Sequence, residues 1–217
     1  MGGHGTTSYE RARLVMVETQ LLGRGIRDEA VLAAFRKVPR ERFVPGDRVG
    51  DAYEDRPVAI GRGQTVSQPY IVALGLQALS LSPGERVLEV GTGSGCQTAL
   101  LAEMGLDVRT VERIPEFAEA ARERLAALGY GRVRCAVGDG TLGWKEDAPY
   151  DGIVVGASAP DLPPALADQL AAGGRLVIPL EDEAGQTLWL YRKRVGALRR
   201  EKLCGCVFVK LIGEQGW

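Results

Sequence analysis

The turn around which this chain is organised reads Leu88-Glu89-Val90-Gly91-Thr92-Gly93-Ser94-Gly95-Cys96. It starts inside a short β-rich run, 86–90, and three alternating glycines follow that run directly. Glycine has no side chain, so the backbone can turn tightly there and approach a ligand closely. A helix over 95–104 is predicted next. A glycine-rich turn between a strand and a helix can also be purely structural, so this stretch alone does not identify a ligand.

Strands and helices alternate from this turn to the end of the chain. The composition of each run predicts further strands over 107–111, 133–137, 150–155 and 174–180, and helices over 115–128 and 164–171. Such alternation is typical of a parallel sheet with helices on both faces. Two last strands, 186–194 and 203–211, are expected to form an antiparallel pair. The sequence therefore predicts an α/β fold with a doubly wound, mostly parallel sheet.

The residues before the glycine turn predict a helical portion that contains a long loop. Apolar residues recur at helical spacing over 9–23 and 28–38, and a third helix is predicted from Pro69 to about Leu81. Residues 39–68 are rich in glycine, proline and arginine and are predicted to be irregular. A stretch of that length inside a compact chain is usually functional or disordered.

These patterns predict one domain. We expect a flexible leader over 1–8 and a single domain over 9–217. Within that domain, 9–82 forms the N-terminal helical and substrate-loop portion, and 83–217 forms the ligand-binding α/β core.

Composition restricts the kinds of partner that we expect. The 217 residues include 27 basic and 28 acidic side chains, and the pI is near 6.0. Electrostatic binding to nucleic acid needs a basic surface, so this balance argues against a nucleic-acid partner. No stretch approaches the ~18 consecutive apolar residues of a membrane span, and the N-terminus lacks the apolar segment of a signal peptide. We therefore expect a cytoplasmic monomer without a membrane partner.

Histidine and cysteine restrict the chemistry. The only histidine, His4, lies in the expected leader, so a histidine base or a histidine metal ligand is not expected. None of the four cysteines (Cys96, Cys135, Cys204, Cys206) has a CxxC or zinc-site spacing. The sequence predicts neither a metal site nor a disulfide.

Acidic residues follow the first strands of the core. Glu89 precedes the glycine turn, the second strand ends in Val111-Glu112, and the third is followed by Gly138-Asp139-Gly140. An acid at the end of the second strand can hold both hydroxyls of a ribose, which favours a nucleoside-type ligand. Glu89 suits a ligand that carries an ammonium group and a sulfonium better than one with a pyrophosphate. The dinucleotide fingerprint would also need glycine where Cys96 stands.

The resulting GxGxG pattern resembles the first motif of class I methyltransferases, which use S-adenosylmethionine (SAM) and release S-adenosylhomocysteine. The resemblance implies that SAM is the cofactor and that Asp139 lies near its adenine. The residues that it assigns to cofactor binding are Glu89, Gly91, Thr92, Gly93, Ser94, Gly95, Glu112, Arg113, Asp139 and Gly140. By the turn pattern alone, Asp139 could equally be a simple turn residue.

A second stretch, Gly63-Gln64-Thr65-Val66-Ser67-Gln68-Pro69-Tyr70, resembles the signature of protein-L-isoaspartate O-methyltransferases. Further matching stretches are Arg24-Gly25-Ile26, Val38-Pro39-Arg40, Phe43-Val44-Pro45, Tyr53-Glu54-Asp55, Ala159-Pro160 and 173–179. The resemblance implies methylation of the free α-carboxylate of L-isoaspartyl residues in damaged proteins and peptides. The ester then closes to a succinimide, and hydrolysis returns some normal aspartate. The implied substrate-binding residues are Thr65, Val66, Ser67, Gln68 and Ala159, with Ser67 as the catalytic residue.

The residues allow this chemistry. A carboxylate is already ionised at neutral pH, so methyl transfer to it needs no general base. Positioning the anion and removing water from it would supply most of the catalysis. Ser67 lies two residues before Pro69, at the N-terminus of a predicted helix. Its hydroxyl donates to the substrate carboxylate by resemblance, or it only caps the helix, which would stabilise the fold by ~1 kcal/mol.

Three other functions compete with this one. A SAM methyltransferase acting on nucleic acid or a small molecule is the closest, followed by a nicotinamide-dependent oxidoreductase and a SAM-binding module without catalytic activity. Three residues, Ser158, Lys210 and Ile212, also depart from the residues that are common in the family.

Overall fold

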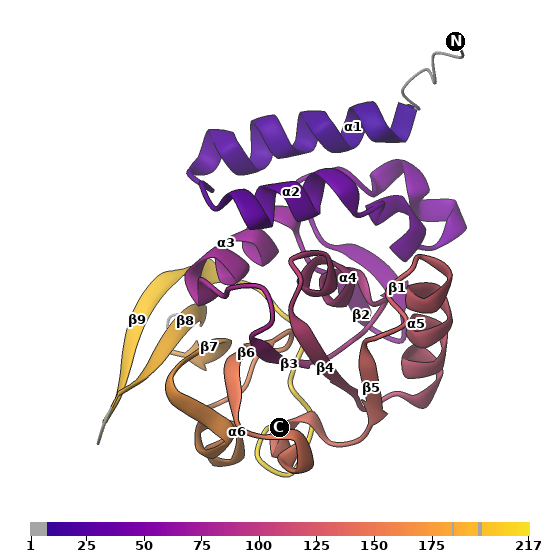
Figure 1. Cartoon of the computed structure of the whole chain (residues 1–217). Helices are drawn as coiled ribbons and strands as arrows, with labels where there is room; N and C mark the ends of the chain where they lie inside the picture. The colour runs from indigo at the N-terminus through magenta and orange to yellow at the C-terminus, as the bar shows by residue number, and fades with distance from the viewer. Residues whose placement is uncertain (1–7, 184, 195–196) are drawn as a thin grey trace.

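The computed structural model describes residues 8–183, 185–194 and 197–217. These residues contain a seven-stranded sheet in the order β5-β4-β3-β6-β7-β8-β9 (Figure 1). Its strands are β3 (Arg86–Val90), β4 (Asp107–Glu112), β5 (Arg134–Val137), β6 (Tyr150–Val155), β7 (Leu170–Asp182), β8 (Gly185–Arg194) and β9 (Ala197–Cys206). The pairs from β5 to β7 are parallel, and β8 and β9 are antiparallel to their neighbours. The predicted fold class is confirmed.

The chain order reverses at β3, which lies between β4 and β6. Ligands of open α/β sheets bind beyond the carboxyl ends of the strands at such a reversal. The glycine turn leaves the sheet at this point, since it follows Val90, the last residue of β3.

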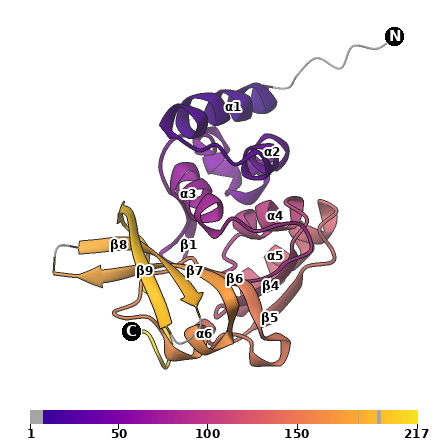
Figure 2. The same ribbon diagram turned by 60° about the vertical axis from the view of Figure 1, so that its left-hand side comes forward.

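Helices cover both faces of the sheet. They are α1 (Ser8–Met16), α2 (Glu29–Lys37), α3 (Pro69–Leu79), α4 (Cys96–Glu103), α5 (Pro115–Ala127) and α6 (Pro164–Gln169). On one face α3 and α4 pack against the strands, and α1 and α2 form an outer layer above them (Figures 1 and 2). Successive strand residues point to opposite faces, so Val87 joins the core under these helices while Leu88 joins the core that includes Leu166 of α6.

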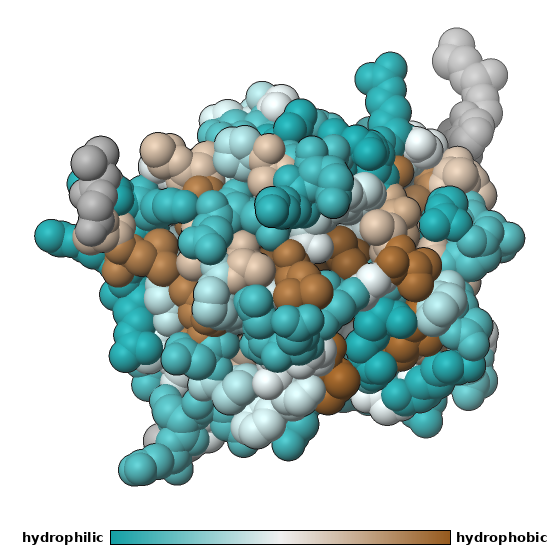
Figure 3. Space-filling model, turned by 90° about the horizontal axis from the view of Figure 1, so that it is seen from below, coloured by the Kyte–Doolittle hydropathy of each residue, from teal (hydrophilic) through white to brown (hydrophobic). Residues whose placement is uncertain are grey.

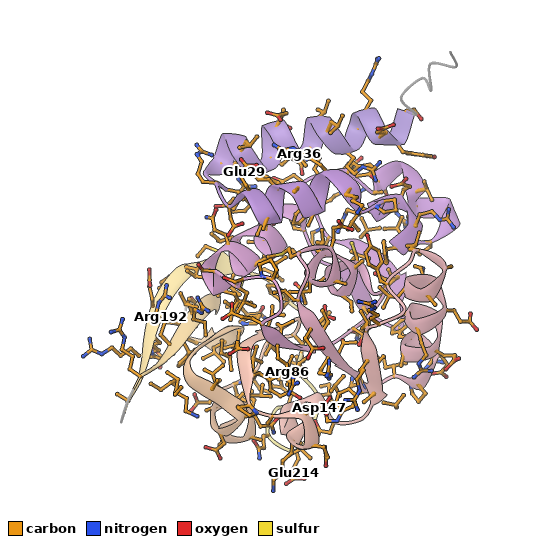
Figure 4. All side chains as sticks on the ribbon, viewed as in Figure 1. Glu29, Arg36, Arg86, Asp147, Arg192 and Glu214 are labelled. Carbon is orange, nitrogen blue, oxygen red and sulfur yellow. The ribbon has the colours of Figure 1, made fainter. Side chains whose placement is uncertain are left out.

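An ion-pair network joins the amino ends of the strands, at the edge away from the glycine turn. Arg109 of β4 is buried and pairs with both Asp107 and Asp147. Asp147 also pairs with Arg134 at 2.6 Å, and its carbonyl oxygen accepts from Arg86 Nη1 at 3.0 Å. Arg86 and Asp147 lie close together in Figure 4. The buried arginine charge of this network, that of Arg109, therefore has two acidic partners.

The N-terminal portion is more regular than the sequence predicts. The helix expected over 9–23 is α1 continued by a π-helical turn (Val17–Leu21) and a 3-10 turn (Leu22–Arg24). The stretch 39–68, predicted to be irregular, contains 3-10 turns and a hairpin of β1 (Val58–Gly61) and β2 (Gln64–Val66). That prediction is wrong for the hairpin.

The hairpin turn has a clear sequence cause. Gly61, Arg62 and Gly63 all have positive φ values, of 96°, 49° and 70°. Two glycines flank the one residue that is strained there, so the Gly-Arg-Gly run specifies a tight reversal.

The last predicted strand, 203–211, is wrong in its position. β9 spans Ala197–Cys206, and its pairing with β8 has an irregularity between Leu188 and Trp189. Most of the first half of β9 is charged and exposed, so its apolar pattern is weak. We call residues 207–217, which leave the sheet and return toward the carboxyl ends of the strands, the C-terminal strap.

The expected leader lies mostly outside the described residues. This holds for 1–7, including His4, whereas α1 begins at Ser8. The division of the domain into 9–82 and 83–217 stays a prediction. No helix among the described residues is long and apolar enough to cross a membrane. The cysteines Cys96, Cys135, Cys204 and Cys206 are all free.

Candidate active site

Three cavities adjoin at the carboxyl ends of the strands, and all three are lined by Thr65 and Gly156. The Ser67 pocket, of about 390 Å³, is lined by Pro57, Thr65, Ser67, Gln68, Ile71, Gly156 and residues 205–209. The Glu112 cavity, of about 60 Å³, is lined by residues of the glycine turn, by Glu112, Arg113 and Gly140, and by the C-terminal strap. The Glu89 cavity, of about 50 Å³, is lined by Arg40, Val66, Ser67, Glu89, 91–94, Cys96 and Gln97, among others. The site therefore has one large compartment and two narrow ones that meet beside Thr65.

Most residues that the sequence assigns to the site lie here. Those that line one of the narrow cavities are Thr65, Val66, Ser67, Glu89, Gly91, Thr92, Gly93, Ser94, Glu112, Arg113 and Gly140. Gly95, Asp139 and Ala159 line none of the three cavities. The structure therefore brings together the cofactor and substrate residues, with three exceptions.

The glycine turn is fixed by the strands on either side. Gly91 and Gly93 have φ values of 91° and 52°, which other residues rarely adopt. Gly91 N donates to the Val111 carbonyl oxygen at 2.8 Å. Gly95 has a φ of 88°, and a Cβ there would lie 3.4 Å from Ala121. Gly95 thus serves the packing of α4 against α5, and Gly91 and Gly93 form the open side of the turn.

Glu89 is a buried acid beneath this turn. Its carboxylate accepts from Gln97 Nε2 at 3.0 Å, from Thr98 Oγ1 at 2.5 Å and from Thr110 Oγ1 at 2.8 Å. Burial raises the pKa of Glu89 to about 7, and these three hydrogen bonds only partly oppose the rise. Glu89 also lines the Glu89 cavity. It is therefore held rigidly where a positively charged ligand group would favour its ionised form.

Glu112 ties the glycine turn to the end of β4. Its Oε2 accepts from Gly93 N at 2.8 Å and its Oε1 accepts from Ile114 N at 2.9 Å. A carboxylate oxygen has more than one acceptor position, so both can still receive hydroxyl donors. Glu112 also lines the Glu112 cavity, at the end of the second core strand.

Asp139, which is predicted to lie near the adenine, uses its carboxylate for hydrogen bonds within the protein. Its carboxylate accepts from Thr141 N at 2.8 Å, from Thr141 Oγ1 at 2.7 Å and from Glu214 N at 2.7 Å. Partial burial opposes ionisation, but the hydrogen bonds from Glu214 and Thr141 hold the pKa of Asp139 below its usual value. Asp139 caps the turn that carries Gly140 and anchors the C-terminal strap, while Gly140 lines the Glu112 cavity.

The C-terminal strap forms a wall of the site, although none of its residues is among the predicted site residues. Lys210, Leu211 and Ile212 line the Glu112 cavity. Leu211 N donates to the Ser158 carbonyl oxygen at 2.8 Å, and Trp217 Nε1 donates to the same oxygen at 3.0 Å. The three residues that depart from the family pattern, Ser158, Lys210 and Ile212, thus lie where the strap meets the segment after β6. Those departures were the signal for this contact.

Ala159 is buried behind this wall. Its N–H donates to the Pro179 carbonyl oxygen at 3.1 Å, and its own carbonyl oxygen accepts from Glu181 N at 3.0 Å. Both backbone groups are therefore used to join the segment after β6 to the end of β7.

Ser67 lies between β2 and α3 and lines both the Ser67 pocket and the Glu89 cavity. The N-cap of α3 is Gln68, and no side chain caps this helix. The alternative role of Ser67 as a helix cap is therefore wrong. Its hydroxyl belongs to a segment that faces both compartments, next to the unpaired N–H groups at the start of α3.

A comparison of the sequence with models of known protein families shows to which family this chain belongs. The family model described as Protein-L-isoaspartate(D-aspartate) O-methyltransferase (PCMT) matches residues 12–216. The chain belongs to this family. Curated relatives agree with the assignment to protein-L-isoaspartate O-methyltransferases. A relative of that name from Pelobacter propionicus is 52% identical over 212 residues, covering 97% of this chain and 94% of the relative. One from Methanoculleus marisnigri is also 52% identical, with coverages of 95% and 94%.

Solved structures of this methyltransferase family are similar to the fold described above. One protein-L-isoaspartate O-methyltransferase is 28% identical with a TM-score of 0.83, over 96% of this chain and 67% of that one. A Plasmodium falciparum protein described by the same name was solved with S-adenosyl-L-homocysteine. It is 28% identical with a TM-score of 0.80, over 95% of this chain and 99% of that one.

Proposed function

We propose that this chain transfers a methyl group from SAM to the free α-carboxylate of L-isoaspartyl residues in damaged proteins and peptides. The family match over residues 12–216 supports the reaction. The observation that supports the site is the position of Ser67, which lines the large pocket and a narrow cavity of the glycine turn at once. An acceptor bound at Ser67 would lie next to a donor held by that turn.

The residues present suit SAM. The turn of Gly91, Thr92, Gly93, Ser94 and Gly95 has no side chain at its two open glycines, and the acids Glu89 and Glu112 lie on either side of it. Two acids favour a ligand with positive charge over a pyrophosphate. In this proposal Glu89 faces the amino-acid part, and Glu112 holds the ribose hydroxyls. Arg113 and Gly140 line the remainder of the Glu112 cavity, and Asp139 caps the turn that carries Gly140.

The chain's own groups would act on an acceptor that is already anionic. SAM would supply the methyl group from its sulfonium. The rest of the molecule would then leave as a neutral thioether. The Ser67 hydroxyl donates to the acceptor carboxylate, and the first N–H groups of α3 favour its negative charge. Thr65, Val66 and Gln68 shape the loop around it, and Gln68 Nε2 is fixed by Asp55 Oδ1 at 2.8 Å. No residue has to remove a proton.

A cytoplasmic monomer that binds neither nucleic acid nor membrane remains our expectation. On the face that Figure 3 shows, hydrophobic residues lie in separate small patches among hydrophilic ones. Scattered apolar surface of this kind is normal for a monomeric protein.

A labelled-methyl assay on matched peptides tests the function. Two peptides that differ only in one aspartyl or isoaspartyl linkage are incubated with labelled SAM. We expect base-labile label on the isoaspartyl peptide alone. Equal labelling of both peptides, or label on neither, would overturn the proposal.

A further inference from the structure

A buried arginine outside this chemistry contacts the Ser67 segment. Arg40 begins a 3-10 turn (Arg40–Phe43), and only 4% of its surface is exposed. Its Nε donates to the Ala52 carbonyl oxygen at 2.7 Å, and its Nη2 donates to the Ser67 carbonyl oxygen at 2.7 Å. Its Nη1 lies 3.8 Å from Cys96 Sγ. One guanidinium therefore joins the loop at Ala52, the segment before α3 and the first residue of α4.

Each acceptor of this guanidinium among the described residues is neutral. Two are backbone carbonyls, and burial raises the pKa of the Cys96 thiol, so the sulfur stays protonated. Burying a cation without an anionic partner is strongly unfavourable. Arg109 shows the usual solution, since it is equally buried but pairs with Asp107 and Asp147. An anion bound near Arg40 would therefore be stabilised by a charge that these neighbours leave uncompensated.

The Arg40 charge lies close to the place where the acceptor anion is expected to bind. Arg40 and Ser67 line the same narrow cavity, and Ser67 also lines the large pocket in which the acceptor is proposed to bind. The acid in that cavity, Glu89, already receives hydrogen bonds from Gln97, Thr98 and Thr110. The Arg40 guanidinium, in contrast, donates to the Ser67 carbonyl oxygen and therefore lies against the acceptor segment.

We propose that Arg40 is a positioning residue for methyl transfer, which fixes the Ser67 segment against α4 and favours an anionic acceptor beside it. The inference rests on the proposed function, because the acceptor carboxylate is the anion concerned. A lysine would keep the charge, but its single ammonium group cannot reproduce the planar fork that contacts three segments.

The test compares Arg40→Lys and Arg40→Gln with Arg109→Lys, a matched change of a buried arginine at the opposite edge of the sheet. We expect kcat/KM for the isoaspartyl peptide to fall about tenfold in Arg40→Lys and further in Arg40→Gln. The Kd of S-adenosylhomocysteine, measured by calorimetry, should stay within about twofold. Arg109→Lys should lower thermal stability and leave kcat/KM unchanged.

A double variant tests whether Arg40 acts through Ser67. If it does, Arg40→Lys combined with Ser67→Ala should be no slower than Ser67→Ala alone. Additive losses, an unchanged kcat/KM in both Arg40 variants, or a parallel loss of S-adenosylhomocysteine affinity would each overturn the inference. An unmodified protein that fails to methylate the isoaspartyl peptide would overturn the proposed function instead, so the two failures are distinguishable.

A measurement on the unmodified protein covers the case in which the Arg40 variants do not fold. With the protein saturated by S-adenosylhomocysteine, calorimetry compares the isoaspartyl peptide with one that carries a carboxamide in place of the acceptor carboxylate. We expect the carboxylate peptide to bind about tenfold more tightly. Equal affinities would show that no uncompensated positive charge acts on the acceptor.

Discussion

Replacing Glu112 with glutamine probes how the end of β4 holds the glycine turn. In the structure one carboxylate oxygen accepts from Gly93 N at 2.8 Å and the other from Ile114 N at 2.9 Å. Glutamine offers one acceptor oxygen, because its other terminal atom is an NH2 donor. One of these two N–H groups, of which that of Ile114 is buried and that of Gly93 half-buried, therefore loses its partner, and the group that should receive the ribose hydroxyls loses its charge.

The two losses have separate magnitudes. A buried N–H without an acceptor costs about 1–3 kcal/mol, so the free energy of unfolding should fall by about that amount. Loss of charge-assisted hydrogen bonds to the ribose should weaken binding by a further ~1–3 kcal/mol, which raises the Kd about 5- to 150-fold. Chemical denaturation of the free protein measures the first effect, and calorimetry with S-adenosylhomocysteine measures the second.

Glu116→Gln is the control for this pair of measurements. The Glu116 side chain is 61% exposed and pairs with Arg62 at the surface, so its removal should change neither quantity by more than a few tenths of a kcal/mol. If Glu112→Gln lowered stability but bound S-adenosylhomocysteine as the unmodified protein does, Glu112 would be a structural tie of the turn and no ribose ligand. The assignment of the Glu112 cavity to the nucleoside would then be refuted.

Three other variants have definite expected outcomes. Ser67→Ala should keep S-adenosylhomocysteine affinity and lower kcat/KM for the isoaspartyl peptide about 10- to 150-fold, as for a lost hydrogen bond to a charged group; unchanged kinetics would remove its catalytic role. For Glu89, the folded-state pKa of about 7 lies above the ordinary 4.5, so the folded protein holds this proton more tightly than the unfolded chain. The contribution of Glu89 to stability is thus largest below about pH 4.5 and is lost as the pH rises to about 7. The free energy of unfolding of Glu89→Gln should therefore rise, relative to that of the unmodified protein, by on the order of 3 kcal/mol across that range. Chemical denaturation at several pH values measures this difference. A constant difference between the two proteins would contradict the raised pKa. Gly213→Ala should lower the free energy of unfolding by about 1–3 kcal/mol, because the added Cβ would overlap the Asp139 carboxylate. Gly46→Ala is the control, since a Cβ there meets nothing within 4 Å. Equal melting temperatures for the two variants would show that the strap accommodates the added methyl group without loss of stability.

The central strands of the parallel core, β3, β4 and β6, could be predicted because they are buried. Runs such as Arg86–Val90 and Tyr150–Val155 are mostly apolar and each is followed by a glycine, and their alternation with helices leaves few topologies. The predicted position of β9 is wrong because the first half of this strand is exposed: Arg199, Arg200 and Glu201 give it no apolar pattern, and its pairing with β8 comes from tertiary contact.

The site could be predicted where a backbone conformation or a strand end specifies it. The glycine turn, Glu112 and the Ser67 loop belong to this class. The burial of Arg40 could not be predicted, because arginine is mostly exposed and only the meeting of three distant segments encloses it. The same limit applies to Asp139, whose partner Glu214 lies 75 residues further along the chain.

The C-terminal strap has a practical consequence for handling this protein. Gln215 N donates to Thr141 Oγ1 at 3.0 Å, Trp217 N donates to the Leu211 carbonyl oxygen at 2.9 Å, and the same segment borders the Glu112 cavity. A purification tag or fluorescent fusion joined after Trp217 would emerge beside this wall of the Glu112 cavity and strain these bonds. Attached ahead of α1, which lies on the far side of the molecule in Figure 1, the same fusion would leave that wall undisturbed.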